Sequence, residues 1–175
     1  ELIYIILSRK TRESAYQHAY DKLKDRYSTW DDAAGAAPEE IEKLIWSSGL
    51  SGRKATSILG ALNAIKEKFG SCSLDDAVDW SDLELESFLC SLPEIQKKSA
   101  YCVMMYSMGR QVFPVDTHVG RIMKRLGPTR ILDIDLDGLD HKRLQSALVD
   151  LVPPVLRHSL HVNMVMHGRA TCKAR

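Results

Sequence analysis

The stretch Leu92–Arg121, LPEIQKKSAYCVMMYSMGRQVFPVDTHVGR, carries the pattern that decides the fold. A tight turn leads into an apolar segment that begins at Lys98 and that Gly109 closes. A glycine commonly ends an α-helix because it adopts the left-handed conformation without strain. Another helix is expected to start near Asp116, whose carboxylate can cap the first turn. The stretch therefore predicts two successive helices, with Lys98 at the start of one and Asp116, eighteen residues later, at the start of the next.

Helical periodicity extends from this stretch in both directions. Apolar residues recur every three or four positions, and strand-like alternation of useful length is lacking. Ser81 and Glu84 form a capping-box pattern, and Pro153-Pro154 is expected to break the chain. The acidic run Asp133–Asp140 is interpreted as a solvated connection, because its spacing does not fit an EF-hand calcium loop. We expect an all-α fold, with helices over residues 2–7, 15–27, 38–48, 53–69, 81–89, 98–108, 116–126, 141–151 and 155–167.

A second turn has the same layout as the one before Lys98. The segment Gly49-Leu50-Ser51-Gly52-Arg53 precedes Lys54, so a helix, a short turn and a helix with a lysine just inside it occur twice. No longer repeat and no low-complexity tract is present in the sequence.

Composition bounds the class of protein. A chain of 175 residues is long enough for one domain or for two small lobes, and 45% hydrophobic with 27% charged residues is typical of a soluble globular protein. The longest apolar stretch, Leu2–Leu7, is too short to cross a bilayer, and no export signal is recognisable, so we expect an intracellular protein without membrane contact. The net charge of +1 does not by itself indicate a nucleic-acid partner.

The chain resembles the helix–hairpin–helix DNA glycosylases, and within them the endonuclease III branch. The resemblance rests on Val115-Asp116-Thr117-His118, on Arg121 three residues later, and on the lysine-to-aspartate gap. Leu7-Ser8 and the segment His167–Cys172 extend it over nearly the whole chain. It implies a two-lobed fold with an active-site cleft between the lobes. Residues 1–110 would form a lobe with the helix–hairpin–helix motif at about 83–109, and residues 111–175 would form the second.

The resemblance implies that Lys98 and Asp116 are catalytic and that the enzyme excises damaged, oxidised pyrimidines and then cuts the strand at the abasic site. The residue types suit this chemistry, because a neutral lysine amine can attack the sugar carbon and leave a Schiff base. An ordinary lysine, with a pKa of about 10, is mostly protonated at neutral pH. Lys97 beside it, the helix N-terminus and partial burial would all lower the pKa of Lys98. Asp116 would stabilise positive charge on the sugar and assist proton transfer.

The resemblance also implies that duplex DNA carrying a damaged base or an abasic site is the partner. Lys10 takes the place of the residue that fills the gap left by an extruded base. The hairpin departs from the Leu-Pro-Gly-x-Gly pattern of the branch, since Glu94 and Gln96 replace both glycines and Glu94 puts a negative charge where a phosphate should approach. We therefore expect weaker anchoring of DNA. A structural or solvated role is the alternative for several of the expected DNA contacts, which are Ser8, Arg9, Lys10, Pro93, Glu94, Ile95, Gln96, Lys97, His118 and Arg121.

Cys172 lies where many relatives carry the first of four cysteines that hold a four-iron four-sulfur cluster. Three more ligands would be needed downstream, and one thiolate cannot hold such a cluster. We expect the sequence to be truncated before or within a cluster loop, with the cluster a property of a complete protein. The proposed chemistry needs no cofactor. Cys72, Cys90 and Cys102 are interpreted as buried thiols of a reducing compartment.

Alternatives remain open within and beyond the enzymes. The chain could be a glycosylase for mismatched, alkylated or methylated bases, or an enzyme that acts mainly on abasic sites. It could also be a non-catalytic helix–hairpin–helix DNA-binding module, which the missing hairpin glycines favour and the Lys98–Asp116 pair disfavours. We expect a monomer in every case.

Overall fold

The computed structural model describes residues 1–126, 139 and 141–174. The chain divides into two compact units, Glu1–Val103 and Met104–Arg175. The division falls inside a helix, whereas the sequence placed it near residue 110. The acidic run predicted as a connection lies outside the described residues, apart from Leu139.

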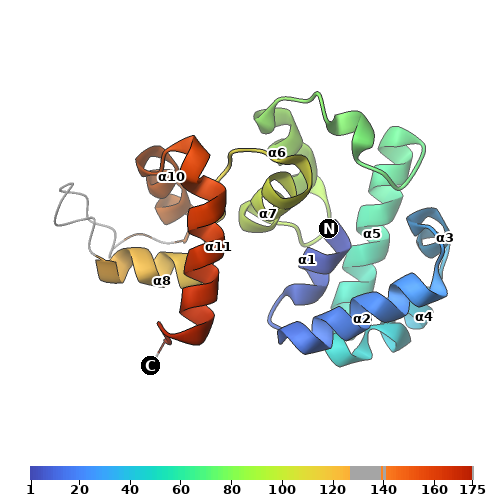
Figure 1. The fold of residues 1–175 in the computed structure, drawn as a ribbon. Helices are drawn as coiled ribbons and strands as arrows, with labels where there is room; N and C mark the ends of the chain where they lie inside the picture. Colours follow the sequence, from blue (N-terminus) through green and yellow to red (C-terminus); the bar gives the residue numbers. More distant parts are fainter. Residues whose placement is uncertain (127–138, 140, 175) are drawn as a thin grey trace. The chain divides into compact units, whose positions relative to one another are not determined.

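The first unit is built from helices only, as far as its residues are described. Figure 1 shows α5, a helix of 19 residues, running beside α1, and α5 also packs against α3 and α4. Ile6, Leu23, Ile41 and Ile58 are almost completely buried and form part of its core. The elements are α1 (Leu2–Ser8), α2 (Glu13–Arg26), α3 (Trp30–Ala34), α4 (Pro38–Leu44), η1 (Trp46–Ser48), α5 (Ser51–Phe69), η2 (Asp75–Ala77), α6 (Asp82–Ser91) and α7 (Lys97–Met108), whose last turns belong to the second unit.

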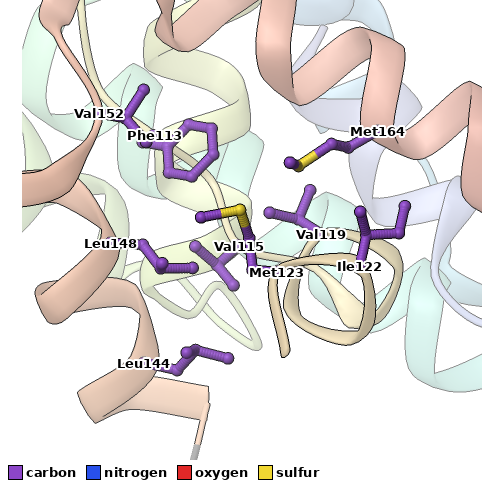
Figure 2. Packing of buried hydrophobic residues seen from close by; sticks show 9 residues of the cluster. All are labelled: Phe113, Val115, Val119, Ile122, Met123, Leu144, Leu148, Val152 and Met164. Atoms are coloured by element: carbon purple, nitrogen blue, oxygen red, sulfur yellow. The ribbon is translucent and has the colours of Figure 1, made fainter. Parts of the chain in front are cut away.

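The second unit contains α8 (Thr117–Leu126), α10 (His141–Leu151) and α11 (Pro154–Ala170). Side chains of all three helices meet those of the extended segment before α8, and Phe113 is completely buried among them (Figure 2). The cluster comprises Phe113, Val115, Val119, Ile122, Met123, Leu144, Leu148, Val152 and Met164. This core fixes the segment from which Asp116 projects.

Local signals explain most helix ends. Ser81 accepts a hydrogen bond from the Glu84 amide, and Glu84 accepts one from the Ser81 amide, so the predicted capping box is confirmed. Gly70 has the left-handed φ of +80° that ends α5, as predicted. A second capping box, between Thr29 and Asp32, starts the short α3 that the apolar pattern did not reveal.

The sequence misplaced the end of one helix. The helix that starts at Pro38 ends at Leu44 rather than just before Gly49, and the 3-10 turn η1 fills the interval. The prediction of an all-α fold is confirmed across the described residues, which contain no strand. None of the helices in these parts of the chain is long and apolar enough to span a membrane.

Candidate functional site

The hairpin between α6 and α7, Leu92–Gln96, is anchored by its apolar residues and exposes its polar ones. Leu92 and Ile95 are 3% and 4% exposed, and the Ile95 amide donates to the Leu92 carbonyl at 3.1 Å. Pro93, Glu94 and Gln96 are exposed. Any contact of Ile95 with DNA would therefore involve its backbone, because its side chain belongs to the core.

One face of α5 holds the hairpin in place. The Ser57 hydroxyl donates to the Pro93 carbonyl at 2.8 Å. A Cβ atom added to Gly60, three residues further along the same face, would lie 2.8 Å from Cγ of Pro93. Atoms that are not bonded do not approach so closely, so the glycine is what lets the hairpin lie directly against the helix. Arg53, in the first turn of the same helix, also contacts the hairpin, because its guanidinium donates a hydrogen bond to the Glu94 carboxylate.

Three strained residues converge on one cavity in this unit. Lys10, Leu50 and Glu94 have φ values of 51°, 52° and 64°, and among the described residues they are the only non-glycine residues with positive φ. Such conformations cost of order 1–3 kcal/mol each and cluster at functional sites. All three line a cavity of about 130 Å³. The remaining lining residues are Arg9, Arg53 and Lys54.

The sequence analysis named three of the six lining residues, Arg9, Lys10 and Glu94, as expected DNA contacts. It named the other three, Leu50, Arg53 and Lys54, only as parts of a repeated turn. The repeated turn before Lys54 was the available signal: Leu50 lies four residues before Lys54, and Glu94 lies four residues before Lys98. Both turns therefore contain a left-handed residue at the same position. Leu50 is 54% exposed.

The carboxylate of Glu94 is held between two arginines. Its Oε2 accepts from Nη2 of Arg9 at 2.8 Å, and its Oε1 accepts from Nη2 of Arg53 at 2.8 Å. The hydrogen bonds from Arg9 and Arg53 lower the pKa of Glu94 to about 2. Glu94 is thus ionised at any ordinary pH, and the charge that the sequence assigned to the hairpin is paired within the protein.

Lys54 is a structural lysine. It is 3% exposed, and its ammonium donates to the carbonyls of Leu7 at 2.7 Å and Ser48 at 2.6 Å and to the Thr11 hydroxyl at 2.7 Å. Burial, together with the charge of Arg9, lowers its pKa to about 8. Lys54 thereby ties the end of α1 to η1 and supports the loop that carries Arg9 and Lys10. Ser8, the last residue of α1, uses its hydroxyl to donate to the Ile5 carbonyl at 2.8 Å.

Lys97 and Lys98, the first two residues of α7, differ in their surroundings. The Lys97 ammonium pairs with Glu86 at 2.9 Å and lies 5.1 Å from the centre of the Tyr101 ring. Burial alone would lower the pKa of Lys97, but Glu86 and Tyr101 outweigh it and raise the pKa. Lys98 is partly exposed and makes no hydrogen bond or ion pair with any residue that the structure describes. Its amine is therefore available to react.

Asp116 caps α8 with one carboxylate oxygen. Its Oδ1 accepts from the backbone amides of His118 at 2.9 Å and Val119 at 2.8 Å. These two hydrogen bonds orient the carboxylate at the first turn of the helix. No bond from a described residue engages Oδ2, so that oxygen can meet a cationic group or a proton.

Buried polar side chains fix the backbone just before Asp116. Nδ1–H of His161 donates to the Pro114 carbonyl at 2.8 Å, and His161 is 2% exposed. Gln145, also buried, accepts from the Val115 amide at 3.4 Å. The sequence analysis did not predict these two residues. His161 of α11 and Gln145 of α10 fix the backbone of the two residues that precede Asp116.

His118 and Arg121 are engaged inside the second unit. The Arg121 guanidinium donates to the carbonyls of Cys172, at 2.6 Å from Nη2 and 3.1 Å from Nε, and of Gly168 at 3.2 Å. The His118 ring packs against Gly168, where an added Cβ would lie 2.6 Å from Nδ1. These residues join α8 to the end of α11, and their expected DNA contact stays a prediction.

Cys172 lies close to two arginines. Nη1 of Arg125 donates to its Sγ at 3.0 Å, and this hydrogen bond, with help from Arg121, lowers the pKa of the thiol. Across the described parts of the chain, no three histidine, cysteine or acidic side chains lie together in a way that could hold a metal ion. The described residues therefore do not fit a four-iron four-sulfur cluster, and the cluster stays a prediction.

Comparison with known proteins identifies the family. The model for the HhH-GPD superfamily of base excision DNA repair proteins matches residues 3–133. The chain belongs to this superfamily. Endonuclease III of Thermotoga maritima is 32% identical over 172 residues, which make up 98% of this chain and 73% of that protein. A protein of Arabidopsis thaliana, provisionally named a DNA glycosylase, is 31% identical over 174 residues, and the chain spans 57% of its length.

Solved structures agree with the sequence relatives. A trapped covalent intermediate of endonuclease III with DNA matches 99% of this chain and 75% of that one, with a TM-score of 0.82 and 28% identity. The predicted resemblance to the endonuclease III branch of the HhH-GPD superfamily is thus confirmed, and so is its helix–hairpin–helix fold.

Proposed function

We propose that this HhH-GPD protein is a DNA glycosylase with abasic-site lyase activity, and that it excises damaged, mainly oxidised, pyrimidines from duplex DNA. The observation that carries the proposal is the state of Lys98. Of the three lysines that follow the two repeated turns, Lys54 is buried with its hydrogen bonds made and Lys97 is ion-paired. Lys98 is partly exposed and, within the described residues, unpaired.

The proposed reaction begins with the neutral Lys98 amine. Its lone pair attacks C1′ of the damaged nucleotide, and the bond from C1′ to the base breaks with its electron pair leaving on the base, which takes up a proton. The nitrogen loses a proton, the C1′–O4′ bond opens with O4′ taking up a proton, and a Schiff base remains between Nζ and C1′. Loss of a proton from C2′ then expels the 3′ phosphate and cuts the strand.

Asp116 has the complementary role in the proposal. Its capping bonds hold one oxygen and leave the other able to stabilise positive charge that develops on the sugar. It can also accept the protons released in the steps above. Neither task needs a metal ion or cofactor, and we propose none.

The partner in this proposal is duplex DNA with a damaged base or an abasic site. The endonuclease III relatives and the endonuclease III–DNA complexes of the same fold support it. The exposed hairpin and the cationic cavity of the first unit supply a surface for the backbone of the duplex. We expect the protein to work as a monomer wherever genomic DNA is.

One observation favours a second candidate, a DNA-binding module without catalysis. Glu94 at the tip of the hairpin adds a negative charge to the surface that would meet phosphate. Such a module would bind duplex DNA with a strong salt dependence and little preference for damage.

A cleavage assay distinguishes the candidates. Duplexes that each carry one oxidised pyrimidine, alkylated base, mismatch, 5-methylcytosine or abasic site are incubated with the wild-type protein, Lys98→Gln and the control Lys22→Gln, an exposed lysine of α2. We expect base release from the oxidised pyrimidine, with strand cleavage that falls at least ~1,000-fold in Lys98→Gln and is unchanged in the control. Cleavage that survives Lys98→Gln would refute the proposed nucleophile. Binding without release of any base would favour the non-catalytic module.

A further inference from the structure

The cavity in the first unit has the composition of an anion site. Four of its six lining residues are basic, and Glu94 is its single acid. Each oxygen of the Glu94 carboxylate receives a guanidinium N–H, and Nη2 of Arg53 reaches both, at 2.8 and 3.1 Å. An oxyanion between two arginines is the arrangement by which proteins bind phosphate groups.

The Glu94 carboxylate can be displaced from between the two arginines. The side chains of Arg9, Glu94 and Arg53 are 36%, 35% and 69% exposed, so their ion pairs face solvent. Ion pairs that face solvent are weaker than buried ones and are screened by salt. A phosphate with a higher charge density can therefore compete with the carboxylate for both guanidinium groups.

The backbone supports the same reading. Glu94 adopts a left-handed φ of 64°, which glycine tolerates without strain and glutamate does not. Lys10 and Leu50, on the other two loops, share this conformation at the same cavity. Arg9 thus adjoins strained Lys10, Arg53 lies in the first turn of α5 just after strained Leu50, and Glu94 is itself strained.

We propose that this cavity is a phosphate-binding site in which the Glu94 carboxylate takes the place of a phosphate in the DNA-free protein, and that a backbone phosphate of the duplex displaces it from Arg9 and Arg53. The inference rests on the proposed function for the identity of the natural ligand. It adds Arg53 as a DNA contact and makes Glu94 a competitor of DNA. The consequence is a protein that binds duplex DNA more weakly than it would without Glu94, because each encounter must first break the internal ion pairs.

The first test compares Glu94→Gln with Glu67→Gln, which removes the same charge from an exposed position of α5. Fluorescence anisotropy measures the Kd for a duplex with a tetrahydrofuran abasic analogue from 50 to 300 mM salt. We expect Glu94→Gln to bind about tenfold more tightly than the wild type at 50 mM, with the gain shrinking as salt screens the internal ion pairs. The Glu67→Gln control should change Kd less than about twofold. A Glu94→Gln variant that binds no better than this control would overturn the proposal.

A double-mutant cycle separates displacement from simple repulsion of DNA by Glu94. Arg53→Gln is combined with Glu94→Gln, and the gain from Glu94→Gln should fall by more than half when Arg53 is absent. Arg53→Gln should also flatten the plot of log K against log salt by about 0.9 in the Glu94→Gln background, as expected for one lost phosphate contact. An equal gain with and without Arg53 would mean plain repulsion and would contradict the proposed site.

Sulfate tests the anion site without DNA. The Tm of each variant is compared in sodium sulfate and in sodium chloride of equal ionic strength, with Glu67→Gln reporting the general effect of sulfate on stability. Glu94→Gln should gain more Tm from sulfate than the control, and an equal gain would overturn the site. If Glu94→Gln does not fold, Glu94→Gly, which also relieves the left-handed strain, replaces it in every arm. A wild-type protein that binds no duplex, beside a Glu94→Gln variant that gains from sulfate, would refute the proposed function and leave the anion site standing.

Discussion

Replacing Gly60 by alanine tests whether the hairpin depends on its close approach to α5. The added methyl group would lie 2.8 Å from Cγ of Pro93, a ring atom that cannot rotate away. Overpacking of this kind costs about 1–3 kcal/mol, whereas alanine in place of glycine inside a helix contributes about 1 kcal/mol of stability. We expect a net loss of about 1 kcal/mol in the free energy of unfolding.

Gly52→Ala is the matched control in the same helix. Its new methyl group would meet Oε1 of Glu42 at 3.3 Å, and that atom ends a flexible side chain that can move. Gly52→Ala should therefore be neutral or stabilising by up to about 1 kcal/mol, so the two variants should differ by about 2 kcal/mol. Urea unfolding followed by circular dichroism measures the difference through the midpoints.

Gly60→Ala should also affect the chemistry, because a hairpin lifted from α5 displaces the start of α7 and with it Lys98. A shift of about 1 Å at a reacting group can slow a reaction by about 100-fold. We expect Schiff-base formation with abasic DNA to be 10- to 100-fold slower (roughly) in Gly60→Ala at a temperature where the variant is folded. If Gly60→Ala is as stable and as fast as Gly52→Ala, the close contact between Gly60 and Pro93 does not support the site.

Three further predictions concern single side chains. Arg121→Met keeps the volume of the side chain but removes the donor to the Cys172 carbonyl. We expect urea unfolding to show a loss of about 2 kcal/mol in the free energy of unfolding. A change below about 0.5 kcal/mol would contradict the role of Arg121 in joining α8 to α11. His161→Phe removes the buried donor to the Pro114 carbonyl and should cost about 2 kcal/mol and slow base excision, whereas unchanged excision would show that His161 does not position Asp116. The pKa of Glu94 is lowered to about 2, so its stabilising contribution is present above pH 4.5 and is lost as the pH falls through 2. The stability gap between wild type and Glu94→Gln should therefore close across that window in acid unfolding curves, and a gap that stays constant would argue against the ion pairs.

Helix ends could be predicted from the sequence where a local group satisfies the backbone. Ser81 with Glu84 and the glycines at 70 and 109 mark such ends, because caps act within a few residues. Leu44 carries no such signal, so the helix was extended in error to Gly49. The five-residue α3 was missed because it is too short for its apolar residues to show a period.

The candidate site could be predicted only in part, because its decisive contacts join distant residues. The spacing of Lys98 and Asp116 pointed to both, but Lys54 occupies the same place in a similar turn, and only burial separates a structural lysine from an available one. Glu94 pairs with residues 85 and 41 positions away, and no local pattern indicates such a partnership. For the same reason the sequence did not predict that Arg121 bonds the Cys172 carbonyl or that His118 packs against Gly168.

The central claim is that Lys98 forms a Schiff base with the sugar of damaged DNA, and borohydride trapping measures this directly. The protein is incubated with an abasic duplex and sodium borohydride, and the cross-linked peptide is identified by mass spectrometry, with Lys98→Ala and Lys22→Ala run in parallel. We predict one adduct on Lys98, absent from Lys98→Ala and unchanged in Lys22→Ala. An adduct that maps to another lysine, or no adduct from folded protein that binds the duplex, would contradict the claim.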